Sequence, residues 1–119
     1  MPVSNSLDKR NEDIQIYING IFYHRVDAKV SVFDSGFLMG DGIWEGLRLV
    51  DEEWIFIDEH LDRLIEGCKA IDIDIGMDKS NLKVALDETR LKNNMSTNAH
   101  ARLMVTRGDK VKPFQQPAL

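Results

Sequence analysis

One short stretch combines closely spaced glycines with two carboxylates and an indole: Gly40-Asp41-Gly42-Ile43-Trp44-Glu45-Gly46. Glycines at this density indicate a backbone that is held in an unusual conformation or approached closely by another group. The G-x-G-x-x-x-G spacing is one residue too long for a dinucleotide-binding fingerprint and does not lie in a βαβ unit. The stretch is therefore either a structural turn or a loop that faces a ligand. Asp41 and Glu45 could form an acid–base pair, although such loop carboxylates are more commonly exposed.

Three arginines lie where a bound anion would need them. Arg63 interrupts an apolar stripe between Leu61 and Leu64. Such an arginine either pairs with a carboxylate on its own helix or presents its planar guanidinium to a phosphate at the edge of a cleft. Arg48 and Arg102 lie on expected strands, where they either form cross-strand salt bridges or together hold the carboxylate of a substrate.

The residues that commonly bind metals or act as nucleophiles form no recognisable site. His24, His60 and His100 are widely separated, and none has another ligand type four residues away. Cys68 lies on an apolar stripe, which is typical of a buried and inert thiol. The sequence also lacks a G-x-S-x-G nucleophile elbow and a phosphate-binding P-loop. We therefore predict no metal site.

Hairpins dominate the first half of the sequence. Isoleucines alternate with polar residues over 14–18, and Asn19-Gly20 follows before residues 21–23. This pattern predicts a β-hairpin, because Asn-Gly readily adopts the positive φ angles of a type I′ turn. Residues 30–33 predict a short third strand. A second hairpin is predicted from residues 47–50 and 54–57, joined across 51–53.

The second half of the sequence predicts two helices and a final strand. Asp58 is the expected N-cap of a helix whose apolar residues recur at helical spacing as far as Ile71. A second helix is expected to begin near Asp78 or Ser80 and to end at Asn93-Asn94, and residues 100–107 alternate as a strand. Hairpins followed by two helices and a returning strand predict an α+β fold, an antiparallel sheet of hairpins with two helices packed on one face.

Composition restricts the class of protein further. The chain has 119 residues, a formal net charge of −5, 43% hydrophobic residues and one cysteine. This length suits one domain, and the acidic balance favours neither nucleic acid nor an anionic membrane as a partner. A single cysteine favours a reducing compartment, and no apolar run is long enough to span a membrane. We expect a cytoplasmic protein.

Five motifs in the same order and at similar spacing resemble the small N-terminal domain of the fold-type IV (class IV) pyridoxal 5′-phosphate-dependent aminotransferases. That family includes branched-chain and D-amino acid aminotransferases and aminodeoxychorismate lyase. The resemblance extends from about Ile14 to Lys110. The motifs are the Asn-Gly turn, the run from Phe33 to Arg48, DEHLDRL (58–64), AIDI (70–73) and ARLMVTRG (101–108).

The resemblance implies roles for six residues. Arg63 corresponds to the arginine that binds the cofactor phosphate. Arg102 corresponds to an arginine that helps to accept an acidic amino donor in branched-chain enzymes, which favours a branched-chain-like substrate with glutamate or 2-oxoglutarate as the amino-group partner. The substrate-pocket positions implied by the resemblance are Met39, Trp44, Gly46, Arg48 and Arg102.

The chain also departs from the family pattern. Met39 stands where branched-chain enzymes usually carry tyrosine, so a hydroxyl is replaced by a thioether. The loop over residues 109–114 lacks the arginine and histidine that D-amino acid enzymes use there. The lysine that binds the cofactor covalently in the family lies in a second domain beyond Leu119. We therefore expect no catalytic residue in this chain and no activity from it alone.

These features predict a flexible leader over residues 1–13, the small aminotransferase domain over 14–110 and the start of an interdomain linker over 111–119. The expected reaction is amino transfer between an amino acid and a 2-oxo acid by a homodimer. One alternative is a lyase that acts on aminodeoxychorismate. The other is a non-catalytic domain that dimerises through Phe37, Leu38 and Met39.

Overall fold

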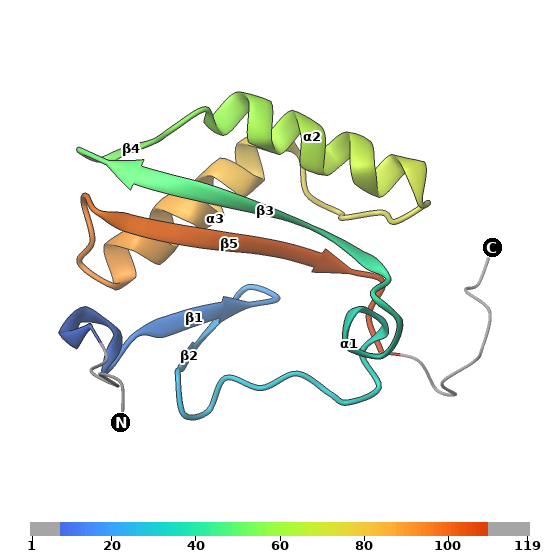
Figure 1. Cartoon of the computed structure of the whole chain (residues 1–119), viewed down its shortest axis with the longest axis horizontal. Helices are drawn as coiled ribbons and strands as arrows, with labels where there is room; N and C mark the ends of the chain where they lie inside the picture. Colours follow the sequence, from blue (N-terminus) through green and yellow to red (C-terminus); the bar gives the residue numbers. More distant parts are fainter. Residues whose placement is uncertain (1–7, 110–119) are drawn as a thin grey trace, which may run out of the picture.

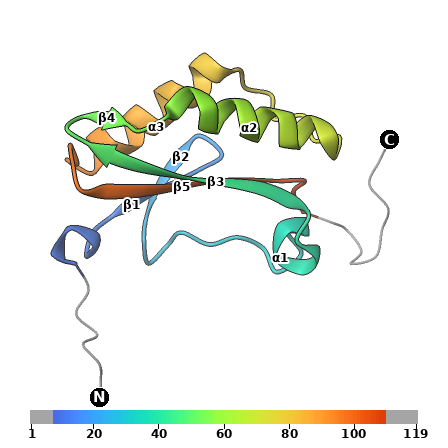
Figure 2. The ribbon, with the colours of Figure 1, turned by 45° about the horizontal axis from the view of Figure 1, so that its top comes forward.

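The computed structural model describes residues 8–109, which form an α+β fold as the sequence predicts. Three antiparallel strands pair in the order β4-β3-β5, and a separate two-stranded hairpin, β1-β2, lies beside them (Figure 1). The two long helices, α2 (Ile57–Ala70) and α3 (Lys79–Lys92), cover one face of the three-stranded sheet (Figure 2). The opposite face carries no helix of comparable length within these residues.

The first predicted hairpin is confirmed. β1 (Gln15–Ile18) pairs with β2 (Ile21–His24), and Ile18 lies opposite Ile21. Asn19 and Gly20 form the turn with φ angles of 51° and 87°, which a type I′ turn requires. β1 contacts α3, and this contact connects the hairpin to the rest of the fold.

The second hairpin is confirmed with different boundaries. β3 (Gly42–Val50) begins inside the glycine-rich stretch, and β4 (Glu53–Trp54) has only two residues. β3 pairs along its length with β5 (Ala99–Thr106), the predicted final strand. Residues 42–46 of the glycine-rich stretch therefore form the first half of a nine-residue strand.

The predicted strand over residues 30–33 is wrong. The Ser31 hydroxyl accepts a hydrogen bond from the Phe33 amide, and the Ser31 carbonyl accepts one from Asp34. These local bonds form a turn in place of strand pairing, which is a common alternative for serine. Val30, Val32 and Phe33 are exposed as a result. The turn leads into a short helix, α1 (Ser35–Met39), at the beginning of β3 (Figure 1).

The N-cap prediction for α2 is wrong, whereas the predicted beginning of α3 near Asp78 or Ser80 is confirmed. α2 begins at Ile57 and its N-cap is Phe56, a residue with φ of 55° that makes no side-chain cap bond. Asp58 lies in the first turn and pairs with Lys83 and Lys79, and Lys83 lowers its pKa. Before α3, the side chain of Asp78 accepts a hydrogen bond from the backbone of Asn81 in a capping box.

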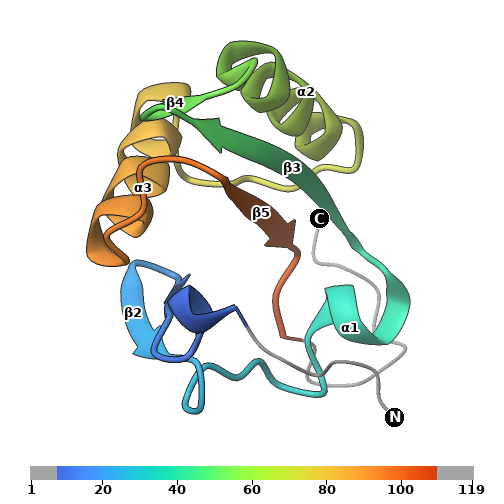
Figure 3. The same ribbon diagram turned by 60° about the vertical axis from the view of Figure 1, so that its left-hand side comes forward.

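The core lies between the sheet and the two helices. Buried leucines from β3, α2 and α3 form one cluster there: Leu47, Leu61, Leu64, Leu82 and Leu86. Figure 3 shows α2 and α3 on the side of the sheet away from α1. No helix within residues 8–109 is both long and apolar enough to cross a membrane. Cys68 is buried, and burial raises the pKa of its thiol.

The predicted domain boundaries stay predictions. Residues 1–7 of the expected leader and the whole expected linker lie outside the described residues. Within the described part of the leader, Lys9–Asn11 form a short 3-10 helix, η1. Arg10 donates hydrogen bonds to the carbonyls of Thr97 and Asn98, which connect η1 to the segment before β5.

Candidate functional site

The alternation of β3 sends its side chains to two different faces. Leu47 and Leu49 are fully buried toward the helices, and the Glu45 side chain is only 4% exposed on the same face. Trp44 and Arg48 are exposed on the opposite face, where Gly46 lies between them. Neighbouring residues of this motif therefore lie on opposite faces of the sheet, because side chains alternate along a strand. We call the face without the helices, which carries Trp44, Gly46 and Arg48, the open face.

β5 adds an arginine to the open face. Arg102 lies opposite Gly46 in the β3–β5 register. Its guanidinium carbon is 4.5 Å from the centroid of the Trp44 ring, a cation–π contact. Neither Arg48 nor Arg102 forms an ion pair with any of the residues 8–109, so the cross-strand salt bridges that were the alternative are not present there.

His100 belongs to this face as well, although sequence reasoning did not assign it a role. It lies opposite Arg48, and a Cβ added to Gly46 would come within 2.9 Å of its ring. Gly46 therefore leaves the space that the imidazole occupies. The alternation of residues 100–106 was the available signal, because it already placed His100 on the same face as Arg102.

Two hollows border this strand pair. One has a volume of about 380 Å³ and is lined by Arg10, Arg48, Asn98 and His100, among others. The other has a volume of about 220 Å³, lies between β1, β5 and α3, and reaches His100 and Arg102. Basic side chains at the rim of both hollows suit a negatively charged small molecule.

Met39 is the predicted pocket residue that lies off the strand pair. It is the last residue of α1, and it is 52% exposed. The structure thus gathers Trp44, Gly46, Arg48 and Arg102 on one face and puts Met39 on the helix that precedes β3.

Arg63 lies on the other side of β3, on α2. Its Nε is 2.8 Å from Oε2 of Glu45, and its Nη2 is 2.7 Å from Oε1. The expected alternative, a pair with a carboxylate on its own helix, is therefore replaced by a pair with the helix-facing carboxylate of β3. His60 Nδ1 lies 2.7 Å from the same Oε1, so α2 supplies both partners of Glu45.

The charges of this cluster stabilise one another. The Arg63 guanidinium holds the pKa of the Glu45 carboxyl below its ordinary value, against the opposite effect of burial, and His60 adds to the lowering. Glu45 in turn raises the pKa of Arg63. The Arg63 side chain nevertheless stays 71% exposed, and its Nη1 has no hydrogen-bond partner within residues 8–109. The outer edge of the guanidinium can therefore donate to a phosphate, which is what a phosphate-binding arginine requires.

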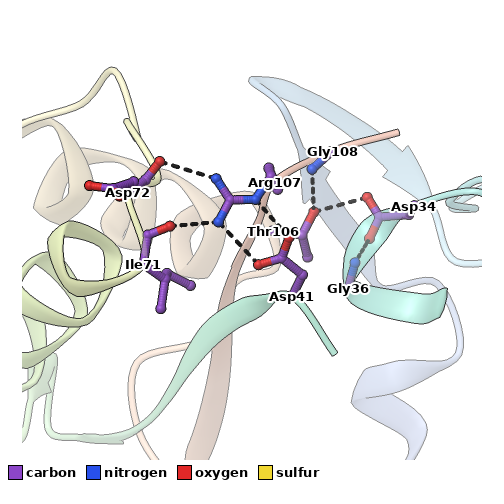
Figure 4. A network of polar contacts seen from close by, with 8 residues as sticks. All are labelled: Asp34, Gly36, Asp41, Ile71, Asp72, Thr106, Arg107 and Gly108. Atoms are coloured by element: carbon purple, nitrogen blue, oxygen red, sulfur yellow. Dashed lines mark hydrogen bonds and ion pairs between the residues drawn. The ribbon is translucent and has the colours of Figure 1, made fainter. Parts of the chain in front are cut away.

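A second arginine–carboxylate pair, Arg107 with Asp41, stands just before the beginning of β3 (Figure 4). Arg107 Nε donates to Asp41 at 2.6 Å, and Nη2 donates to the other carboxylate oxygen. The same guanidinium also donates to the carbonyls of Ile71 and Asp72 beyond α2. Asp41 and Glu45 are therefore both largely buried and paired with arginines, so the expectation of exposed loop carboxylates is wrong for both.

The segment next to this pair is held to β5 (Figure 4). Asp34 is the N-cap of α1, and its carboxylate accepts hydrogen bonds from the amides of Gly36 and Phe37. The Thr106 hydroxyl donates to the other carboxylate oxygen at 2.9 Å and accepts from the Gly108 amide. These bonds fix the helix that carries Met39 against the end of β5.

Comparison with known proteins identifies the family. Residues 42–118 match the family described as Amino-transferase class IV, and the chain belongs to that family. The resemblance found in the sequence is thereby confirmed.

Individual relatives agree with this assignment. The putative branched-chain-amino-acid aminotransferase of Methanocaldococcus jannaschii is 45% identical over 95 residues, which cover 80% of this chain and 33% of that protein. The D-alanine aminotransferase of Listeria innocua is 36% identical over 95 residues, which cover 80% of this chain and 32% of that protein. The crystal structure of the branched-chain amino acid aminotransferase from Escherichia coli superposes with a TM-score of 0.75 at 28% identity, covering 82% of this chain and 34% of that one. The chain thus spans about a third of the length of these relatives.

Proposed function

We propose that this chain is the small N-terminal domain of a pyridoxal 5′-phosphate-dependent aminotransferase that acts on a branched-chain-like amino acid and a 2-oxo acid. The observation that carries the proposal is the pair of anion-binding features on the two sides of β3. Arg63 presents a free guanidinium edge on one side, and Arg48 and Arg102 lie beside Trp44 on the other.

The cofactor fits the first of these features. A phosphate monoester at neutral pH carries a charge between −1 and −2, and a guanidinium binds it through two parallel N–H donors. Arg63 would hold that phosphate, while the bound cofactor supplies the electron sink that amino transfer needs. The site residues in this chain bind and orient, and none of them is assigned a catalytic role.

The substrate would lie against the open face of β3 and β5. Trp44 offers a large apolar surface that suits a branched aliphatic side chain. Arg102 and Arg48 would hold the carboxylate of an acidic amino donor, and Gly46 leaves room beside His100. Met39 would border the same pocket from α1.

The lysine that binds the cofactor would come from a second domain of about twice this length, in keeping with the length of the relatives. Under this proposal residues 14–110 form the small domain, residues 1–13 its leader and residues 111–119 the beginning of the linker. The assembled enzyme would be a cytoplasmic homodimer, for which exposed Phe37, Leu38 and Met39 offer an apolar contact.

The test is to produce the protein encoded by the complete reading frame that contains residues 1–119 and to measure its binding of the cofactor. We expect absorbance of protein-bound pyridoxal 5′-phosphate and transfer of the amino group from leucine or glutamate to a 2-oxo acid. Arg63→Ala is expected to lower cofactor affinity by at least about tenfold, because charge-assisted hydrogen bonds to the phosphate are lost. Lys69→Ala, which removes another cation from α2, is the matched control. A well-folded protein that binds no cofactor would contradict the proposal.

The substrate is tested on the same protein. Arg102→Leu is expected to raise the KM for glutamate more than the KM for leucine, because only glutamate has a second carboxylate. Release of pyruvate from aminodeoxychorismate would identify a lyase. A dimer with neither activity would favour the non-catalytic alternative, and sedimentation measures that dimer directly.

A further inference from the structure

Glu45 is a buried carboxylate on the strand that bears the proposed substrate face, yet both residues that donate to its side chain within residues 8–109 come from α2. Both of its oxygens accept hydrogen bonds, from Arg63 Nε and Nη2 and from His60 Nδ1, at 2.7–2.8 Å. We propose that Glu45 is a positioning residue that fixes the Arg63 guanidinium so that its outer edge is ready to bind a phosphate monoester. This inference rests on the proposed function and deepens it.

The contrast between the two ends of the Arg63 side chain supports this role. The side chain as a whole is 71% exposed, and an exposed arginine samples many rotamers. Its Nε and Nη2 are nonetheless held by a carboxylate that is only 4% exposed and is itself part of a strand. Binding a phosphate to a guanidinium that is already oriented avoids most of the entropy loss that a free side chain would suffer.

The backbone of Glu45 gives the pair a fixed reference point. Glu45 lies opposite Leu103 in the β3–β5 register, between Trp44 and Gly46 in sequence. The orientation of Arg63 is therefore set by the same strand that carries the open face. A phosphate bound at Arg63 and a substrate bound at Trp44 would keep a constant spacing, which a catalytic geometry requires.

Charge alone predicts the opposite effect of Glu45. A carboxylate next to Arg63 cancels positive charge and repels a phosphate, so its removal would strengthen phosphate binding if electrostatics dominated. The positioning role predicts that removal weakens binding, because the guanidinium loses its orientation. The sign of the change in affinity therefore separates the two explanations.

The experiment titrates inorganic phosphate into the ¹⁵N-labelled 119-residue chain and follows the Arg63 Nε–H signal by NMR. We expect Glu45→Gln to weaken phosphate binding by roughly tenfold, in line with the conformational entropy of one arginine side chain. Asp41→Asn is the matched control, since it changes the net charge equally and alters the Arg107–Asp41 pair just before β3. It is expected to leave the phosphate affinity unchanged.

A second measurement needs no Glu45 variant, in case Glu45→Gln does not fold. In the unmodified chain, the Arg63 Nε–H signal is expected to show restricted motion before phosphate is added and to keep its Glu45-bonded position at saturation. Loss of that position on phosphate binding, or an Nε–H as mobile as that of a free arginine, would overturn the inference. Equal or tighter phosphate binding by Glu45→Gln, or no binding by the unmodified chain, would do the same.

The two proposals fail differently. If Arg63→Ala abolishes phosphate binding and Glu45→Gln does not weaken it, only the positioning role of Glu45 is wrong. If Arg63→Ala leaves both phosphate binding here and cofactor affinity in the complete protein unchanged, the cofactor role of Arg63 is wrong, and the inference fails with it.

Discussion

Two arginine–carboxylate pairs lie along β3, one through Glu45 on the strand and one through Asp41 just before it, and they differ in which N–H donors they leave free. Arg107 directs its donors to Asp41 and to the carbonyls of Ile71 and Asp72, and its side chain is 23% exposed. Arg63 bonds only to Glu45 among residues 8–109, and its side chain is 71% exposed. All three nitrogens of the Arg107 guanidinium donate to protein acceptors, whereas Nη1 of Arg63 donates to none within residues 8–109.

This difference separates a structural arginine from one that can bind a ligand. Arg107 connects the beginning of β3, the end of β5 and the segment after α2, so its charge serves the fold (Figure 4). Arg63 contributes one edge to the fold and offers the other to solvent. Free donor capacity, more than charge or burial, is therefore the property that marks an arginine as an anion-binding candidate.

The largest effect on stability is expected from disruption of the Arg107–Asp41 pair. Asp41→Ala removes the carboxylate that faces the Nε of Arg107 and leaves a partly buried guanidinium without its counter-charge. We expect the melting temperature to fall by about 10 °C. Thermal denaturation followed by circular dichroism measures it. A fall of less than about 2 °C would contradict the structural role given to this pair.

A smaller effect is expected from protonation of Glu45. Its pKa is lowered in the folded chain, so the unfolded chain takes up the proton first as the pH falls. The stability that the pair contributes is complete above about pH 5, and it is lost as the pH falls through the lowered pKa of the folded state. The melting temperature of the unmodified chain is therefore expected to exceed that of Glu45→Gln at pH 6.

The same comparison is then repeated in acid. At pH 3 the difference between the two proteins is expected to be smaller than at pH 6, and other acidic groups affect both proteins alike. A difference in melting temperature that stays constant with pH would show that the ionised form of Glu45 does not stabilise the folded chain.

Local patterns in the sequence were sufficient for much of the fold. Asn19-Gly20 specified its turn, and Asp78 specified the beginning of α3 because its partner Asn81 is three residues away. Residues 30–33 failed because a serine hydroxyl competed with strand pairing at short range. Asp58 failed as an N-cap because the N-cap lies two residues earlier than expected, at Phe56 with its positive φ.

The candidate site was less predictable because its contacts join distant residues. The strand expected from the sequence began at Leu47, so Trp44 and Gly46 were grouped with Arg48 by the family resemblance and not by strand alternation. Glu45 and Arg63 are 18 residues apart and Arg107 and Asp41 are 66 apart, so neither pair leaves a local signal. Only the packing of α2 on β3 and the pairing of β3 with β5 reveal which guanidinium keeps a free edge.

A moderate effect on stability is expected from Asp34, which connects α1 to the end of β5. Asp34→Ala removes the N-cap of α1 and the acceptor of the Thr106 hydroxyl. Loss of a cap costs about 1 kcal/mol, which corresponds to a fall of about 5 °C in melting temperature. Asp34→Asn, which retains an acceptor, is the control and is expected to recover most of that fall. Equal losses in both variants would contradict the capping role.

The smallest effect on stability, together with a clear effect on binding, is expected for Arg63→Lys. Lysine keeps the positive charge next to Glu45, so the melting temperature is expected to change by less than about 2 °C. A single ammonium group cannot satisfy Glu45 and also present a second, oriented edge to a phosphate, because it lacks the planar fork of arginine. We therefore expect the affinity for inorganic phosphate to fall by about tenfold in the same titration. Full phosphate affinity in Arg63→Lys would show that charge is sufficient, and the contrast between Arg63 and Arg107 would then lose its functional meaning.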